Sequence, residues 1–145
     1  MNTGFVDIPS VRGYTCFQLF TGVESQTMQV HPLRSEHMNH TSLQHLCQEL
    51  GSPAAIKSDN AKLETSTKWN AICRQQCIAQ LASEAENQQQ NKAECRIEDV
   101  CRLGAVALHK TGGDKRLWCY PLEHICEHYD KCRLFYPFCG LAKIA

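Results

Sequence analysis

The chain has 145 residues, 43% of them hydrophobic, and its 15 basic residues balance 15 acidic ones. This length and hydrophobic content predict one domain with a single core. A neutral chain lacks the excess positive charge that is typical of generic nucleic-acid binders. The sequence contains no run of eighteen apolar residues, so it predicts no membrane-spanning helix.

Three strands in close succession open the predicted fold. Residues 4–8 and 14–21 are rich in β-branched and aromatic side chains, and residues 26–33 alternate Met28 and Val30 with polar neighbours. The links between these segments are short. This pattern predicts an antiparallel meander of three strands.

From about residue 41 the apolar residues recur at the spacing of a helix instead of a strand. Thr41 and Gln44 match a capping box, which predicts the start of the helix there. Gly51 predicts its end. The apolar residues that recur at helical spacing are Leu43, Leu46, Cys47 and Leu50.

The second half of the chain alternates strands and helices. The predicted elements are a strand at 54–59, a helix at 67–76, a strand at 77–83, a polar mobile loop at 84–91, a helix at 92–109 and a helical segment at 114–129. Pro121 predicts that the last helix begins or kinks near it. The residues predicted to share an inward face are Trp69, Ile72, Cys73 and Gln76 in one helix and Ile97, Val100, Cys101 and Leu108 in the next.

The order β-β-β-α-β-α-β-α predicts an α/β fold in which helices cover the faces of a mixed sheet. Ten cysteines are scattered through it without a C-x-x-C pair, so no zinc finger is predicted. The N-terminal stretch "MNTGFVDIPSVRG" has neither a basic start nor an apolar run, which predicts no signal peptide. We therefore expect an intracellular location, nuclear or cytoplasmic and not secreted, where the reduced thiols act mostly as small apolar fillers.

Two carboxylates occupy positions suited to a site. Asp59 follows a predicted strand, and ligands of open α/β sheets gather beyond the carboxyl ends of strands. Glu94 shares a predicted sheet-facing stripe with Ile97 and Cys101, where an unpaired carboxylate is costly. A structural interpretation remains open for both residues. Asp59 suits a turn, and Glu94 forms a cap box with Asn91.

Four segments, "RGYTCFQLFT", "SDNAK-x5-KW", "QNKAE" and "RLWCYPLEHIC", together resemble the integrase catalytic core of copia-type LTR retrotransposons. The resemblance runs collinearly from Met1 to about residue 130. It implies an RNase H-like fold over 1–130, in which Met1 falls inside a truncated first strand, and a divergent C-terminal tail over 131–145.

The resemblance also implies a chemistry. The family uses two Asp and one Glu to hold two divalent ions, Mg²⁺ or Mn²⁺, for DNA cleavage and strand transfer. By resemblance Asp59 is the second Asp and Glu94 is the Glu. Lys62 and Lys92 lie in the same motifs and become candidates for phosphate contacts, although ordinary solvated lysines would look the same. The implied partners are DNA, both the retroelement ends and the target, and a second copy of the chain, with no membrane.

The first Asp of the family pattern is absent. Counting back from Arg12-Gly13 places Asn2-Thr3 where Asp-Thr belongs. A neutral amide removes one negative charge from a site for two dications, which weakens the attraction by several kcal/mol. Asp7 lies five residues further on, so along a strand it points to the opposite face, and we expect a turn or surface residue there. Catalysis is therefore expected to be impaired.

Three other functions stay open. The chain could be an active polynucleotidyl transferase with Asn2 as a replaced ligand, in which case Asn2→Asp should increase the rate. It could be a non-enzymatic DNA- or protein-binding module on the same fold, distinguished by the salt dependence of DNA binding. It could also be an α/β domain in which Asp59 and Glu94 only cap, so that Ala at either position would cost about 1 kcal/mol.

Overall fold

The computed structural model describes residues 1–25, 27–58, 66–82 and 92–135, with the backbone alone for 82, 92, 93 and 129–135. The strands in this part of the chain are β1 (Asn2–Phe5), β2 (Cys16–Thr21), β3 (Met28–Leu33), β4 (Ala55–Ser58) and β5 (Ala79–Ala82). The helices there are the 3-10 turn η1 (Glu36–Met38), α1 (Asn39–Leu50), α2 (Thr67–Gln75), α3 (Lys92–Thr111), the 3-10 turn η3 (Lys115–Leu117) and α4 (Cys119–Phe135). The polar loop predicted at 84–91 lies outside the described residues.

The strands form two hydrogen-bonded groups. An antiparallel sheet has the order β1-β2-β3, as the predicted meander requires, and β4 pairs in parallel with β5. In the first group β2 is central, and its register places Gly4 of β1 opposite Phe17. A Cβ at Gly4 would overlap the Phe17 ring, so this close approach of β1 to β2 requires glycine.

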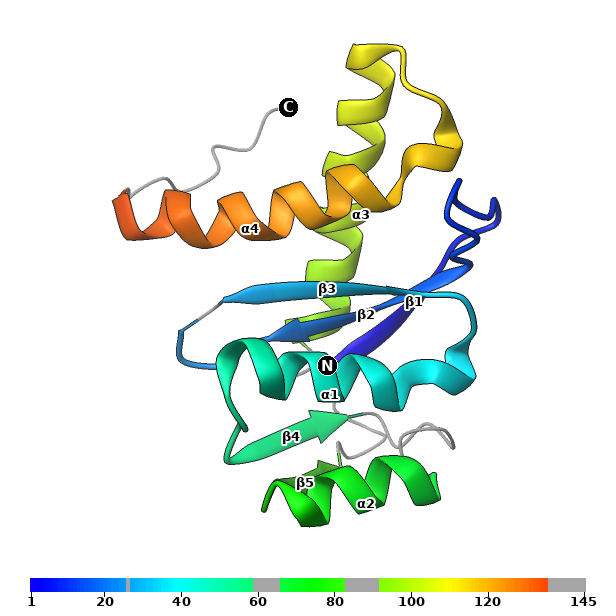
Figure 1. Cartoon of the computed structure of the whole chain (residues 1–145). Helices are drawn as coiled ribbons and strands as arrows, with labels where there is room; N and C mark the ends of the chain where they lie inside the picture. Colours follow the sequence, from blue (N-terminus) through cyan, green and yellow to red (C-terminus); the bar gives the residue numbers. More distant parts are fainter. Residues whose placement is uncertain (26, 59–65, 83–91, 136–145) are drawn as a thin grey trace.

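Helices cover both faces of the β1-β2-β3 sheet (Figure 1). Phe17 and Leu19 of β2 are buried in one cluster together with Val100 of α3 and Trp118 and Leu122 beside and within α4. Phe20 points to the other side, where it is buried with residues of α1, β4, α2 and the start of the β5 segment, namely Leu43, Leu46, Ile56, Trp69, Ile72, Cys73 and Ile78. The alternation along β2 therefore produces a helix–sheet–helix arrangement with a core on each face.

Two predicted boundaries were wrong. The first strand was predicted at 4–8 but ends at Phe5, because the chain bends at Asp7 and Ile8. The capping box at Thr41 does not form. The preceding turn η1 leads directly into α1, whose N-cap Met38 makes no side-chain cap bond, and the Thr41 hydroxyl donates to the Met38 carbonyl at 2.7 Å.

Other predicted boundaries are confirmed. Gly51 ends α1 with φ of 87°, a left-handed value that favours glycine. Pro121 lies in the first turn of α4, where a missing backbone N–H costs nothing. The predicted limit of the core at residue 130 falls within α4, so the division into a core and a tail remains a proposal.

The predicted inward faces are largely confirmed. In α2, Trp69, Ile72 and Cys73 are buried, whereas Gln76 is exposed because it follows the last helical residue. In α3, Val100 is buried and the other three predicted residues, Ile97, Cys101 and Leu108, pack against the same cluster.

Four cysteines have the burial expected of small apolar fillers, namely Cys16, Cys73, Cys119 and Cys126. Burial raises the thiol pKa of Cys16, Cys73 and Cys119, which keeps these groups in the neutral form. Their place in the core gives no reason to assign them a catalytic role.

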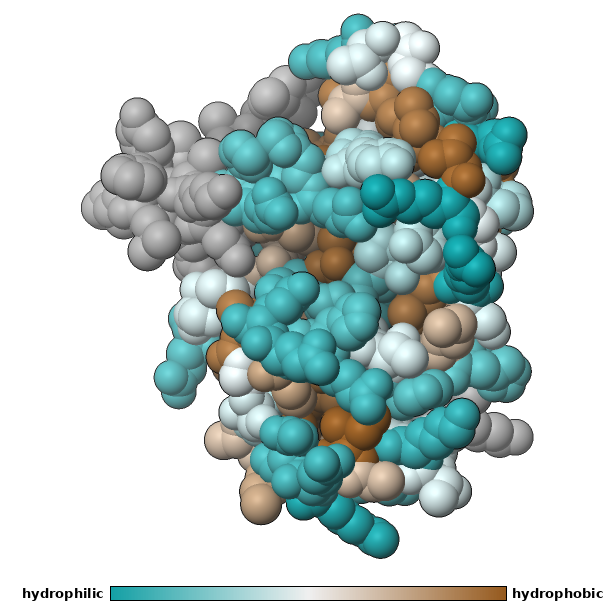
Figure 2. All heavy atoms as spheres, in the orientation of Figure 1, coloured by the Kyte–Doolittle hydropathy of each residue, from teal (hydrophilic) through white to brown (hydrophobic). Residues whose placement is uncertain are grey.

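The outer surface of the α1 layer is mostly hydrophilic, with hydrophobic patches visible between neighbouring segments (Figure 2). Within the described residues, no helix is both long enough and apolar enough to cross a bilayer.

Candidate functional site

A hydrogen bond between backbone groups brings the start of β1 to the end of β4. The Met1 nitrogen donates to the Lys57 carbonyl at 2.9 Å. Asn2 follows Met1 directly, and β4 ends at Ser58, one residue after Lys57. The two groups of strands therefore meet near Asn2, which stands at the position predicted for the first Asp. The end of β4, which directly precedes Asp59 in the sequence, lies at the same junction.

Asn2 is half-buried on β1, and its side chain is already engaged. Its Oδ1 accepts a hydrogen bond from the Thr3 N–H at 2.9 Å. On the opposite face of the strand, the Thr3 hydroxyl donates to Oε1 of the buried Gln18 at 2.9 Å. One acceptor site of the Asn2 oxygen is thus used locally, which leaves a second lone pair for any further ligand.

The predicted second acid and its neighbouring lysine, Asp59 and Lys62, lie outside the described residues. The predicted strand that precedes Asp59 is present as β4, which ends at Ser58. The strand-end position of Asp59 in the sequence therefore fits the prediction, while the role of its side chain stays a prediction.

Glu94 is not buried against the sheet, so that expectation was wrong. It lies in the first turn of α3 and is exposed, although Ile97 and Cys101 on the same stripe pack inward. Exposure removes the desolvation cost that made Glu94 conspicuous in the sequence.

The other two predicted site residues, Lys92 and Glu94, belong to α3, which packs against the sheet. The helix begins at Lys92, whose side chain lies outside the described set, and it contacts both β1 and β2. Across the described ranges, no three or more His, Cys, Asp or Glu side chains are grouped closely enough to hold a metal ion. The metal-ligand roles predicted for Asp59 and Glu94 stay predictions.

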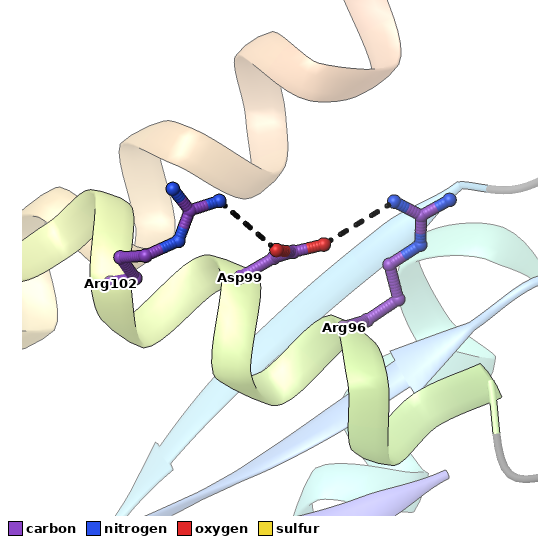
Figure 3. Close-up of polar contacts among 3 residues, drawn as sticks. All are labelled: Arg96, Asp99 and Arg102. Carbon is purple, nitrogen blue, oxygen red and sulfur yellow. Dashed lines mark hydrogen bonds and ion pairs between the residues drawn. The ribbon is translucent and has the colours of Figure 1, made fainter. Parts of the chain in front are cut away.

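Two arginines of α3, Arg96 and Arg102, were not singled out by the sequence analysis. Asp99 bridges Arg96 and Arg102, with N–O distances of 3.9 and 3.2 Å (Figure 3). Both pairs follow from the i, i+3 spacing. A carboxylate between two guanidinium groups lowers their combined charge, which reduces the attraction of this helix face for phosphate.

A hollow of about 420 Å³ lies beside β3, between α1 and α4. His31, Glu49 and Glu123 are among the residues that line it. Burial lowers the pKa of His31 and raises that of Glu123, because burial disfavours the charged form of each group. No sequence motif indicated this hollow, because its walls come from one strand and two distant helices.

Comparisons with known proteins give matches among solved structures alone. Neither a scan against protein-family models nor a search of curated proteins finds a match. A chain in the cryo-EM structure of the simian T-cell lymphotropic virus intasome with PP2A regulatory subunit B56 gamma is similar with a TM-score of 0.65 and 14% identity. The alignment covers 83% of this chain and 45% of that one, so the chain spans less than half of that relative.

Two structures of the HTLV-2 integrase catalytic core domain in complex with magnesium are also similar. The trimeric form gives a TM-score of 0.61 at 16% identity, over 78% of this chain and 75% of the other. The dimeric form gives 0.57 at 14% identity, over 74% and 70%. The fold is RNase H-like. Helices on both sides of the β1-β2-β3 sheet, with β4 joined to the start of β1, are the described parts of this RNase H-like fold.

Proposed function

We propose that this protein is an integrase catalytic-core-like domain of copia-type retrotransposon origin, with an impaired site for metal-dependent polynucleotidyl transfer. The Met1–Lys57 hydrogen bond carries the proposal, because it brings Asn2 to the strand end that precedes Asp59. Contact of α3 with β1 and the similarity to integrase catalytic cores add support. Residues 1–130 form the core in this proposal, and 131–145 form a divergent tail.

The donor atoms of the proposed site suit a hard divalent cation. Asn2, Asp59 and Glu94 supply only oxygen, the ligand type that Mg²⁺ prefers, and the HTLV-2 integrase core was solved in complex with magnesium. Two bound ions, Mg²⁺ or Mn²⁺, would supply stabilisation of the attacking and leaving oxygens of an in-line phosphoryl transfer. The weakness of the set is its charge, because Asn2 contributes none.

Each of the five candidate site residues has a role in this proposal. Asp59 and Glu94 provide the negative charge, and Asn2 provides an oriented amide oxygen fixed by Thr3. Lys62 and Lys92 contact DNA phosphates, which would position a duplex without reading its sequence. The trimeric and dimeric forms of the HTLV-2 core support a homo-oligomer as the assembly of this chain.

Restoring the missing charge is the direct test. We expect Asn2→Asp to tighten Mg²⁺ binding, measured by calorimetry, by about tenfold or more, since a gain of about 1.4 kcal/mol is a factor of ten. The same variant should show increased Mg²⁺- or Mn²⁺-dependent nicking and strand transfer on an oligonucleotide duplex. Additional Glu94→Gln should remove both gains.

The matched control is Glu98→Gln in the Asn2→Asp background. Glu98 is another exposed carboxylate of α3, one turn beyond Glu94, so its neutralisation changes the helix charge equally. We expect it to leave metal affinity and nicking unchanged. The proposal fails if neither the wild type nor Asn2→Asp responds to Mg²⁺ or Mn²⁺ in binding and activity.

A non-enzymatic binding module is the second candidate. The balanced net charge and the bridging of Arg96 and Arg102 by Asp99 favour it over a strongly DNA-binding enzyme. A core that uses Lys62 and Lys92 on phosphates should bind DNA with an affinity that falls steeply as salt rises. Absent or salt-independent binding in a fluorescence titration would favour a protein partner.

A further inference from the structure

The hollow of about 420 Å³ beside β3 draws its walls from three elements. β3 runs between α1 and α4, and both helices pack against it (Figure 1). Polar side chains line the hollow from all three, namely Gln29 and His31 of β3, Ser42 and Glu49 of α1, and Glu123 and Glu127 of α4. Hydrogen-bonding groups from distant parts of the chain therefore converge on one space.

Two polar atoms of the β3 wall are buried without a hydrogen-bond partner. They are Oε1 of Gln29 and Nε2 of His31. The Gln29 amide is held in place, because its Nε2 donates to Oε2 of Glu49 at 3.0 Å. This bond fixes Oε1 as the atom left over, and a buried acceptor without a donor is costly. A ligand that brings a donor to this oxygen would remove the cost.

The hydroxyl groups of the α1 wall also present acceptors. The Ser42 hydroxyl donates to the Asn39 carbonyl at 2.6 Å, and the Thr41 hydroxyl donates to the Met38 carbonyl at 2.7 Å. Each hydroxyl has only one proton, so the lone pairs of its oxygen remain for a ligand. The hollow is therefore rich in acceptors whose donors are engaged elsewhere.

The charges of the lining have one sign. Glu49, Glu123 and Glu127 line the hollow, and none of its described lining residues is Lys or Arg. Burial raises the pKa of Glu123, Arg12 lowers it from outside the lining, and Glu127 raises it. Arg12 thus offsets part of the negative charge on the α4 side only. A cation inside the hollow would be attracted from both helices.

A guanidinium group meets these surfaces better than an ammonium group. It is planar and carries five N–H donors in a fixed fork, so it can reach several acceptors at once. It is also more weakly hydrated than an ammonium group and stacks on aromatic rings. The rings of His31 and His45, whose centroids lie 6.1 Å apart, both line the hollow. Val30 and Leu33 offer apolar surface to an attached alkyl chain.

We propose that the hollow binds an organic cation with an alkylguanidinium group. Its N–H groups donate to Oε1 of Gln29 and to the carboxylates of Glu49 and Glu127, and its alkyl chain packs against β3. A free small molecule and an arginine side chain of another protein carry the same group. The site shares no residue with the metal-dependent function proposed above, so the two can fail separately.

The probe is butylguanidinium, titrated without divalent ions near neutral pH and followed by NMR. We expect saturable binding that shifts the ring signals of His31 and the side-chain amide signals of Gln29. Butylurea has nearly the same shape and no charge, and it should bind more weakly by about tenfold or more, because charge-assisted hydrogen bonds are the stronger ones. Butylammonium, which lacks the planar fork, should also bind more weakly.

Neutralising one carboxylate of either helix tests the assignment within the protein. Glu49→Gln and Glu127→Gln should each weaken butylguanidinium binding by about fivefold or more, since each removes an ionic acceptor. Glu127 is exposed, so its variant is expected to fold even if the change at Glu49 disturbs the bond to Gln29. The matched control is Glu98→Gln, at an exposed carboxylate of α3 outside the lining, which should leave the affinity unchanged.

N-acetylarginine methylamide distinguishes the two sources of the cation. Tighter binding of this compound than of butylguanidinium would identify an arginine side chain, and equal or weaker binding would identify a free small molecule. Three results would overturn the proposal. They are no saturable binding of butylguanidinium, equal binding of butylurea or butylammonium, and equal loss of affinity in Glu127→Gln and Glu98→Gln, which would show attraction by the overall charge alone.

Discussion

The His31 ring lies between two aromatic neighbours in a partly closed setting. Its centroid is 5.7 Å from that of Phe20 and 6.1 Å from that of His45, and its Nε2 is buried without a hydrogen-bond partner. Burial lowers the pKa of His31, Glu49 opposes this shift and His45 adds to it. The folded protein therefore resists a proton that the unfolded chain accepts at about pH 6.5.

This residue predicts a loss of stability on acidification. As the pH falls through about 6.5, the unfolded state binds a proton that native His31 still excludes, so the free energy of unfolding decreases until the lower native pKa is reached. His31→Gln should reduce the difference between urea midpoints measured at pH 7.5 and 5.5. His37→Gln, at an exposed histidine, should leave that difference as in the wild type. An equal pH response in wild type and His31→Gln would contradict this assignment.

Single residues also limit what the candidate site can do. Asn2 and Glu94 were selected by their places in motifs, and the structure puts Asn2 at the β1–β4 junction and Glu94 on an exposed first turn. The sequence could identify these residues because motif order is linear. It could not predict the exposure of Glu94, because the depth of a helix turn depends on where the sheet ends.

At the scale of elements, the helix starts show how local signals compete. α1 carries a capping-box sequence but begins without a side-chain cap, because η1 precedes it. α2 has a working cap at Ser66, whose hydroxyl accepts the Trp69 N–H at 3.3 Å. Trp69 is itself a buried residue of the α1-side core, so this cap fixes the first turn of the helix at a core contact.

Removal of this cap should be measurable. We expect Ser66→Ala to lower the free energy of unfolding by about 1 kcal/mol, because the Trp69 N–H loses its acceptor. Ser66→Asp retains an acceptor and should lie close to the wild type. Urea denaturation followed by tryptophan fluorescence gives the comparison. Equal destabilisation by Ala and Asp would show that the cap bond contributes nothing.

At the scale of the molecule, the segment between β1 and β2 is tied to the start of α4. The Trp118 Nε1 donates to the Ile8 carbonyl at 2.9 Å, and the Val11 N–H donates to the Arg116 carbonyl at 2.9 Å. The Arg12 guanidinium lies 4.9 Å from the centre of the Tyr120 ring. Trp118 also packs in the α3–α4 core, 6.1 Å from Phe17. These contacts join segments more than a hundred residues apart.

This connection predicts the effect of Trp118→Phe. The change leaves the Ile8 carbonyl without its donor and reduces packing against Phe17, so we expect a loss of about 2 kcal/mol in the free energy of unfolding. Tyr120→Phe keeps the ring beside Arg12 at a more exposed position and should change stability by less than about 0.5 kcal/mol. Thermal unfolding of both variants tests the difference, and equal melting temperatures would contradict it.

The sequence by itself determined the order and type of the elements and the inward faces of α2 and α3, because hydrophobic periodicity is a property of neighbouring residues. It also identified Asn2, Asp59 and Glu94 as the candidate residues. The tertiary structure alone decided that β1 meets β4 at Met1, that Glu94 is exposed and that the His31 ring is half-buried. These features depend on contacts between distant segments, whose geometry follows from how the helices and strands pack together and is not encoded in any local pattern.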